Sequence, residues 1–108
     1  MENGEKRIVL MTAANQEDAA RIAKALVAEK LVACVNIVPA VRSIYMWKGE
    51  VLDEEEVMMI AKTTAARFGA MMERVASLHS YDVPEIIAAP IVDGAQPYLD
   101  WIDETLGA

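Results

Sequence analysis

The sequence is poor in the residues on which many common activities depend. It has one cysteine, so no disulfide can form within the chain and no cysteine pair is available for a structural zinc site. It has one histidine, His79, so any nucleophile–histidine pair would have to converge on that residue. Glycine-rich phosphate loops, zinc-protease motifs and nucleophile elbows are also absent. We therefore expect a protein that is not an enzyme.

Basic residues are few as well. Ten Lys and Arg oppose 17 Asp and Glu, giving a net charge of −7 with the histidine neutral. No run of Lys or Arg offers a footprint for a phosphate backbone, so nucleic acid and anionic membranes are excluded as expected partners. No apolar run approaches the roughly 20 residues that span a bilayer, and residues 1–6 do not resemble a signal peptide. We expect a cytoplasmic protein.

Apolar residues are abundant, at 55% of a chain of 108 residues. A domain this small buries only a limited part of its surface, and exposed apolar patches usually mark interfaces. An alanine-rich core is the plainer alternative. We expect a single domain over residues 1–108, with its core at about 8–105, that associates with copies of itself.

The first part of the chain predicts a strand followed by a helix. Residues 8–13 form a continuous apolar run, which is typical of a strand buried on both faces. Asn15 is a suitable helix N-cap, and apolar residues then recur at helical spacing as far as Val27.

The middle of the chain predicts a long β-hairpin. Residues 31–47 and 51–63 are rich in strand-forming residues, with a two-residue turn at Lys48-Gly49 and a break at Pro39. At about 3.3 Å per residue such arms reach about 45 Å, whereas a globule of this length has a radius of gyration near 13 Å. The hairpin must therefore bend, or project and pair with a neighbouring subunit.

The remaining elements complete a recognisable order. Thr64 can cap a second helix that ends near Leu78, residues 85–89 form a short strand, and Pro97 suits the first turn of a last helix. Strand, helix, strand, strand, helix, strand, helix is an α+β, ferredoxin-like (βαββαβ) plan with a C-terminal helix. Right-handed crossovers then place the two main helices on one face of the sheet.

His79 is the most interesting polar residue. It falls at the end of the second predicted helix and is followed closely by Tyr81, Asp82 and Glu85. These side chains could converge on a metal ion or a polar ligand. Equally, His79 could cap the helix while Tyr81 and Glu85 serve structure. The sequence leaves both interpretations open.

Other candidate ligands have simpler interpretations. Cys34 lies in an apolar stretch, which favours a buried packing residue over a reactive thiol. Core filling by the methionines is favoured over thioether binding of copper. Strand alternation divides the acidic residues 53–56 between two faces, so a solvated hairpin arm is favoured over a site for a hard cation.

Four stretches resemble the CutA family. Residues 26–36 contain a counterpart of its Leu-Ala-Ala-Cys-Val-Asn segment, and Pro39 with residues 43–49 resembles its hairpin tip. Residues 78–87 resemble its His-Pro-Tyr-Glu-Val-Pro-Glu motif, and residues 98–102 match the start of its last helix. The stretches occur in the family's order from about residue 8 to residue 105.

The resemblance implies a very stable homotrimer, similar to that of the PII proteins, whose hairpins join sheets across subunits. It implies divalent-cation tolerance and copper binding through His79, with Cys34, Lys62, Tyr81 and Glu85 gathered in clefts between subunits. The alternative is a PII-like sensor that binds a small anionic metabolite in the cleft, with Lys62 meeting the anionic group. An interaction scaffold is a third possibility.

The sequence departs from the family at four positions. Ser80 and Asp82 stand where the family usually has Pro and Glu, and Met11 and Leu78 stand where copper-binding members can carry Cys and His. Only His79 remains of that ligand set. A copper site would therefore need symmetry-related copies of the chain to bring ligands together.

Overall fold

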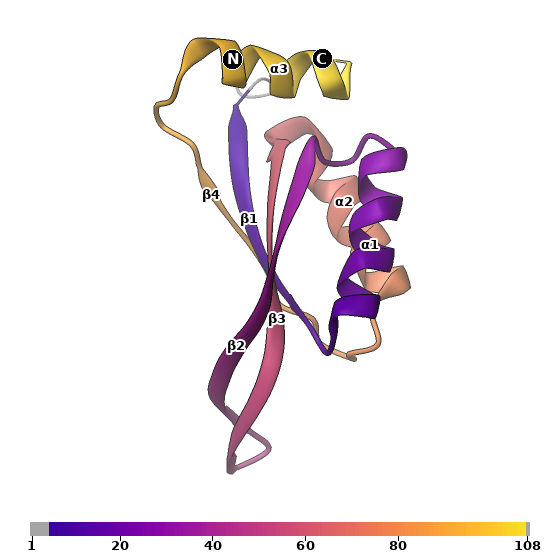
Figure 1. Ribbon diagram of the computed structural model, residues 1–108, viewed down its shortest axis with the longest axis vertical. Coiled ribbons are helices and arrows are strands. Elements are labelled where there is room, and N and C mark those ends of the chain that lie inside the picture. Colours follow the sequence, from indigo (N-terminus) through magenta and orange to yellow (C-terminus); the bar gives the residue numbers. More distant parts are fainter. Residues whose placement is uncertain (1–4, 108) are drawn as a thin grey trace.

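The computed structural model describes residues 5–107 and has the expected order of elements. The antiparallel sheet has the strand order β2-β3-β1-β4, and α1 and α2 lie side by side on one of its faces (Figure 1). The α+β, ferredoxin-like prediction is therefore confirmed. The elements are β1 (Lys6–Ala13), α1 (Gln16–Ala28), β2 (Cys34–Trp47), β3 (Glu50–Thr64), α2 (Ala65–Leu78), β4 (Ile86–Pro90) and α3 (Gln96–Leu106).

Helix α1 is closed at both ends by local hydrogen bonds. The Asn15 side chain accepts a hydrogen bond from the backbone N–H of Asp18 at 2.8 Å, as expected of an N-cap. At the other end Lys30 takes a positive φ of 57°, and the N–H of Leu31 donates back to the carbonyl of Leu26 at 2.9 Å. Residues 31–33 therefore belong to the turn after α1, and the prediction that the next strand begins at residue 31 is wrong by three residues.

Helix α2 begins where expected but is capped differently. Thr64 is the N-cap residue, yet its side chain makes no capping hydrogen bond and its hydroxyl is buried without a partner among the described residues. The first N–H of the helix, on Ala65, instead donates to the carbonyl of Glu5 at 2.8 Å. A non-local backbone acceptor has replaced the side-chain cap.

The core lies between the sheet and the two main helices. Alternate residues of β1 and β3 face α1 and α2, as the two-residue period of a strand requires. A smaller cluster of Ala33, Ile102 and Leu106 lies under α3. The main core includes Val9, Met11, Ala13, Ile22, Leu26, Val57, Met59, Ala61, Met71 and Val75.

The β2–β3 hairpin confirms the expected long arms and turn. Lys48 and Gly49 have φ values of 49° and 81°, the pair of positive angles that a tight two-residue turn needs. The pairing register shifts between Val38 and Val41, at the break expected from Pro39. The molecule is 43 Å long and 25 Å by 22 Å across, and the hairpin extends beyond the two main helices (Figure 1).

Apolar side chains are exposed on two surfaces. The first, the hairpin tip, comprises Ile44, Tyr45, Met46, Trp47 and Val51, with Met46 64% and Val51 68% exposed. The second, the open face, is the side of the sheet away from α1 and α2. Its residues alternate with those of the core, and they are Leu10, Val38, Met58, Ile60 and Ile87.

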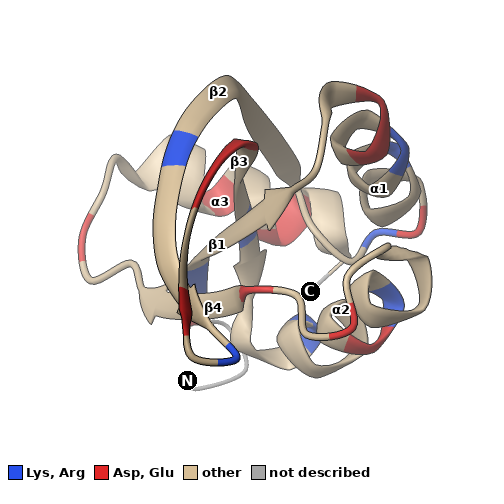
Figure 2. Ribbon diagram, turned by 90° about the horizontal axis from the view of Figure 1, so that it is seen from below, with Lys and Arg blue, Asp and Glu red and all other residues tan. Residues whose placement is uncertain are grey.

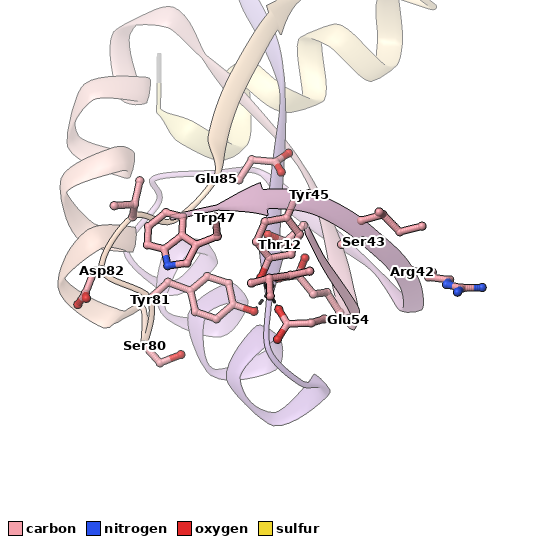
Figure 3. A pocket seen from close by; sticks show the side chains of 14 residues that line it. Thr12, Arg42, Ser43, Tyr45, Trp47, Glu54, Ser80, Tyr81, Asp82 and Glu85 are labelled. Carbon is pink, nitrogen blue, oxygen red and sulfur yellow. Dashed lines mark hydrogen bonds between the residues drawn. The ribbon is translucent and has the colours of Figure 1, made fainter. Parts of the chain in front are cut away.

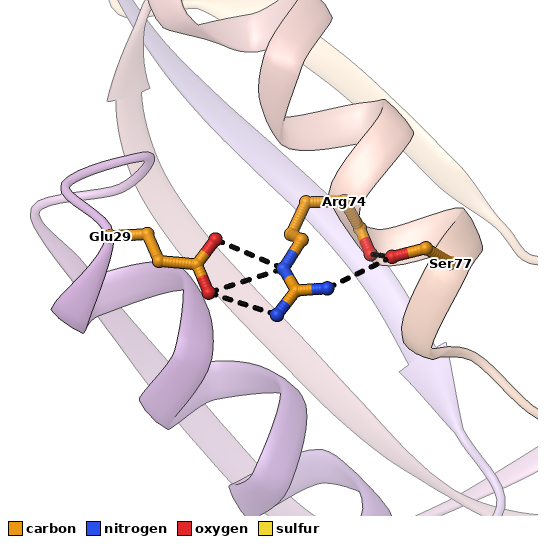
Figure 4. A network of polar contacts seen from close by, with 3 residues as sticks. All are labelled: Glu29, Arg74 and Ser77. Atoms are coloured by element: carbon orange, nitrogen blue, oxygen red, sulfur yellow. Dashed lines mark hydrogen bonds and ion pairs between the residues drawn. The ribbon is translucent and has the colours of Figure 1, made fainter.

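An ion pair joins the end of α1 to α2. The guanidinium of Arg74 contacts both carboxylate oxygens of Glu29 at 3.0–3.2 Å (Figure 4). The hydroxyl of Ser77 donates a hydrogen bond to the backbone carbonyl of Arg74 at 2.7 Å. Because the pair is exposed, it contributes at most about 1 kcal/mol to the stability of the fold.

Acidic residues follow β3 along the hairpin (Figure 2).

None of the helices within residues 5–107 has the length and apolar character needed to span a bilayer.

Candidate functional site

A pocket of about 850 Å³ lies between the hairpin and the loop that joins α2 to β4 (Figure 3). The loop supplies Tyr81, Asp82 and Glu85, and β1 contributes Thr12. We call this the acidic pocket. Its aromatic and acidic lining includes Tyr45, Trp47, Glu54, Glu56, Tyr81 and Glu85.

The register of the hairpin places the pocket residues of β2 and β3 on one face. Tyr45 pairs with Leu52, and Trp47 pairs with Glu50, across the two strands. Since alternate residues share a face and opposite residues point the same way, the rings at 45 and 47 lie on the same face as Glu54 and Glu56. The acidic residues 53–56 are divided between two faces, as expected.

Each of two glutamates in the pocket accepts a hydrogen bond from a tyrosine. The Tyr81 hydroxyl donates to Glu56 at 2.6 Å, and the Tyr45 hydroxyl donates to Glu54. Burial, and next the bond to Glu56, raises the pKa of Tyr81, while the bond to Glu54 is the main cause that raises the pKa of Tyr45 to about 12. Both hydroxyls therefore remain protonated donors near neutral pH.

We expect the tyrosines of the folded protein to titrate above the ordinary pKa of about 10. The chain has three, and the pKa of Tyr98 is also raised, chiefly by its hydrogen bond with Cys34. Since the unfolded chain releases these protons first, the stability they provide is complete below about pH 10 and is lost as the pH rises toward 12. The absorbance of tyrosinate should rise at higher pH in the folded protein than in the protein unfolded by denaturant. If the tyrosines of the native protein titrate near pH 10, these hydrogen bonds are not formed.

His79 is the C-cap residue of α2 and is already hydrogen-bonded through both ring nitrogens. Nδ1 accepts from the backbone N–H of Tyr81 at 3.0 Å, so Nε2 carries the proton and donates to the carbonyl of Thr12 at 2.7 Å. The ring also lies 4.6 Å from the Tyr81 ring, centroid to centroid. His79 therefore joins β1 to the loop that forms one side of the acidic pocket.

The side chains present in one chain do not make a ready copper site. Among residues 5–107, no three His, Cys, Asp or Glu side chains are grouped so that they could hold a metal ion. His79 can ligate a cation only after it gives up one of its two hydrogen bonds. Metal binding at His79 stays a prediction.

The residues expected in a ligand cleft form two groups within the chain. Tyr81 and Glu85 line the acidic pocket, whereas Cys34 and Lys62 pair with each other across β2 and β3. The Cys34 thiol lies 3.6 Å from the Tyr98 hydroxyl, and Lys62 contacts Asn36. Lys62 is six positions from Glu56 along β3, a distance of about 20 Å. An anionic ligand of the cleft remains a prediction.

Glu54 and Glu56 were not singled out as site residues by the sequence. The acidic stretch reads as a solvated arm, yet Glu56 is only 8% exposed. The usable signal was the alternation that places 54 and 56 on the same strand face. The burial of Glu56 depends on Tyr81, which is 25 residues away in sequence.

Comparison with known proteins identifies the family. Residues 7–105 match the family model described as "CutA1 divalent ion tolerance protein". A divalent-cation tolerance protein CutA of Thermus thermophilus is 51% identical over 94% of this chain and 99% of its own length. A rice protein, "Protein CutA 1, chloroplastic", is 44% identical over 88% of this chain, which spans 54% of that protein. A solved structure from Archaeoglobus fulgidus has a TM-score of 0.91 and 42% identity, covering 94% of this chain and 98% of that one.

The names of these relatives differ in the location they state. The rice protein is called chloroplastic and the Archaeoglobus structure is described as periplasmic, so a cytoplasmic location for this chain stays a prediction. What they share is the CutA name, carried by sequences and structures that align along nearly the whole of the present chain. The chain therefore belongs to the CutA1 divalent ion tolerance family.

Proposed function

We propose that the protein acts in divalent-cation tolerance as a homotrimer that binds a divalent cation, copper first among them, through His79, and that it is a binding protein rather than an enzyme. The observation that carries the proposal is an incomplete site in a family named for divalent ions. One chain offers a single imidazole, hydrogen-bonded to the loop that forms one side of the acidic pocket, without a complete set of metal ligands among residues 5–107.

Two surfaces support association of the chain with its own copies. The open face and the hairpin tip leave large apolar side chains in water, which is unusual for a small monomer. The hairpin also extends beyond the body that could cover it. Copies that covered these surfaces would bring carboxylates and imidazoles of different chains together.

The chemistry of the available groups suits a divalent cation. Imidazole is a good ligand for copper, and carboxylates add negative charge. The net charge of −7 raises the local concentration of cations, although salt screens this effect beyond about 10 Å. On binding, His79 would release the N–H of Tyr81 from Nδ1, because the lone pair on that nitrogen is the one available to a metal.

Paramagnetic resonance of added Cu(II) provides a direct test. We expect saturable binding with nitrogen coupling from imidazole, absent in His79→Gln. Because each chain has one histidine, the number of coupled imidazoles counts the chains around each ion. Three imidazoles at one ion per three chains would support a shared site. Saturable binding without imidazole coupling, or no binding, would exclude His79 as the ligand.

A further inference from the structure

We propose that the acidic pocket binds an organic cation, namely an alkylammonium or guanidinium group held by carboxylates and aromatic rings. His79 contacts Tyr81 but does not itself line the pocket, and the test below is made without a metal ion. The ligand of the pocket is a charged amine with an apolar stem.

The pocket carries negative charge that no cation among its lining residues compensates. Glu54, Glu56 and Glu85 line the pocket, and none of them forms an ion pair with another side chain of residues 5–107. The one cationic side chain in the lining, Arg42, is bound through two nitrogens to Asp53. Figure 3 shows Arg42 directed away from the rest of the group. The pocket therefore presents negative charge to whatever enters it.

The need for a compensating cation is greatest at Glu56, because this residue is more than nine-tenths buried. The only hydrogen bond to its carboxylate within the described chain comes from a neutral hydroxyl, that of Tyr81. Buried carboxylates are normally paired with a cation, since removing their charge from water is costly and one neutral donor offsets only part of that cost. A positively charged occupant would complete the site.

The aromatic residues of the pocket indicate which kind of cation it suits. The rings of Tyr45, Trp47 and Tyr81 also line the pocket (Figure 3). Aromatic faces attract organic cations, with Trp the most effective, and the Lys48 ammonium already lies 5.9 Å from the centroid of the Trp47 ring. Aromatic walls also suit the apolar stem of an amine. A hydrated metal ion makes no use of such walls.

The size of the pocket agrees with an organic ligand. Its volume of about 850 Å³ lies within the range of about 300–1,000 Å³ that small-molecule sites occupy. The ammonium group can come from a free amine or from a lysine or arginine side chain of a second copy of this chain. The recognising chemistry is the same, and the test distinguishes the two sources.

The probe is putrescine, a linear diamine, with butanediol as its uncharged counterpart, titrated by calorimetry at low ionic strength in the presence of a chelator. Glu56→Gln removes the charge but keeps an acceptor for Tyr81, and Glu55→Gln makes the same charge change on the opposite face of β3. We expect wild type and Glu55→Gln to bind putrescine but not butanediol. Glu56→Gln should bind it about tenfold more weakly or worse. Trp47→Leu, which leaves all charges in place, should also weaken binding.

A second measurement covers the other source. If putrescine does not bind, sedimentation velocity over a dilution series measures how strongly each variant associates with itself. Weaker self-association of Glu56→Gln than of Glu55→Gln would then identify a side chain of a second copy as the occupant. Equal putrescine binding by wild type and Glu56→Gln, equal binding of butanediol, or no effect of Glu56→Gln in either measurement would overturn the proposal. None of these readouts involves copper, so the metal proposal can fail or succeed separately.

Discussion

Leu26→Ala is expected to lower the free energy of unfolding by about 2–5 kcal/mol. Leu26 is fully buried on the inner side of α1, in the cluster formed with β1, β3 and α2. Truncation removes apolar burial and leaves a cavity that the surrounding strands cannot fill completely. Denaturant unfolding at a fixed protein concentration measures the effect, since self-association would otherwise change the apparent stability.

The neighbouring residue provides the matched control. Val27 lies on the same helix but is 42% exposed, and Val27→Ala should change the unfolding free energy by about 0.5 kcal/mol or less. Alanine also has the higher helix propensity, which offsets part of the lost packing. Similar losses for the two variants would mean that the core between α1 and the sheet is not where the structure places it.

The parts of the fold that depend on local chemistry could be predicted from the sequence. Lys48-Gly49 and Pro39 determine where the hairpin turns and where its register slips, and both predictions are confirmed. The start of β2 was misplaced because Lys30, not a glycine, takes the left-handed conformation that ends α1. A lysine gives no sequence signal for that conformation.

The candidate site depends on contacts that no local pattern contains. His79 could be singled out as a polar residue at a helix end, but its acceptor, the carbonyl of Thr12, is 67 residues away. Likewise, the acidic stretch showed which residues share a face but not that Tyr81 would fold over Glu56. Strand alternation is a local property, whereas the burial of a charge depends on which loop covers it.

Ile60→Glu is expected to abolish the proposed homotrimer. Ile60 is half-buried at the centre of the open face, between Met58 and Lys62 on β3, with its side chain directed away from α1 and α2. If copies of the chain meet through this face, each would place a carboxylate in a largely apolar interface. The neighbouring cation, Lys62, already contacts Asn36, so burying the new charge costs several kcal/mol per copy. Sedimentation equilibrium should find the wild type at three times the 11.8 kDa of one chain and the variant at the mass of one chain.

A control is needed because a new charge can affect solubility by itself. Val92→Glu adds the same charge at an apolar residue that is 91% exposed on the loop before α3, and it should leave the mass of the assembly unchanged. Because Ile60 alternates with the buried Met59 and Ala61, the Ile60→Glu chain should retain its fold and its circular dichroism. A variant that still assembles would place the interface elsewhere. A folded monomer that keeps His79 but loses imidazole coupling to Cu(II) would mean that the metal site needs ligands from more than one subunit.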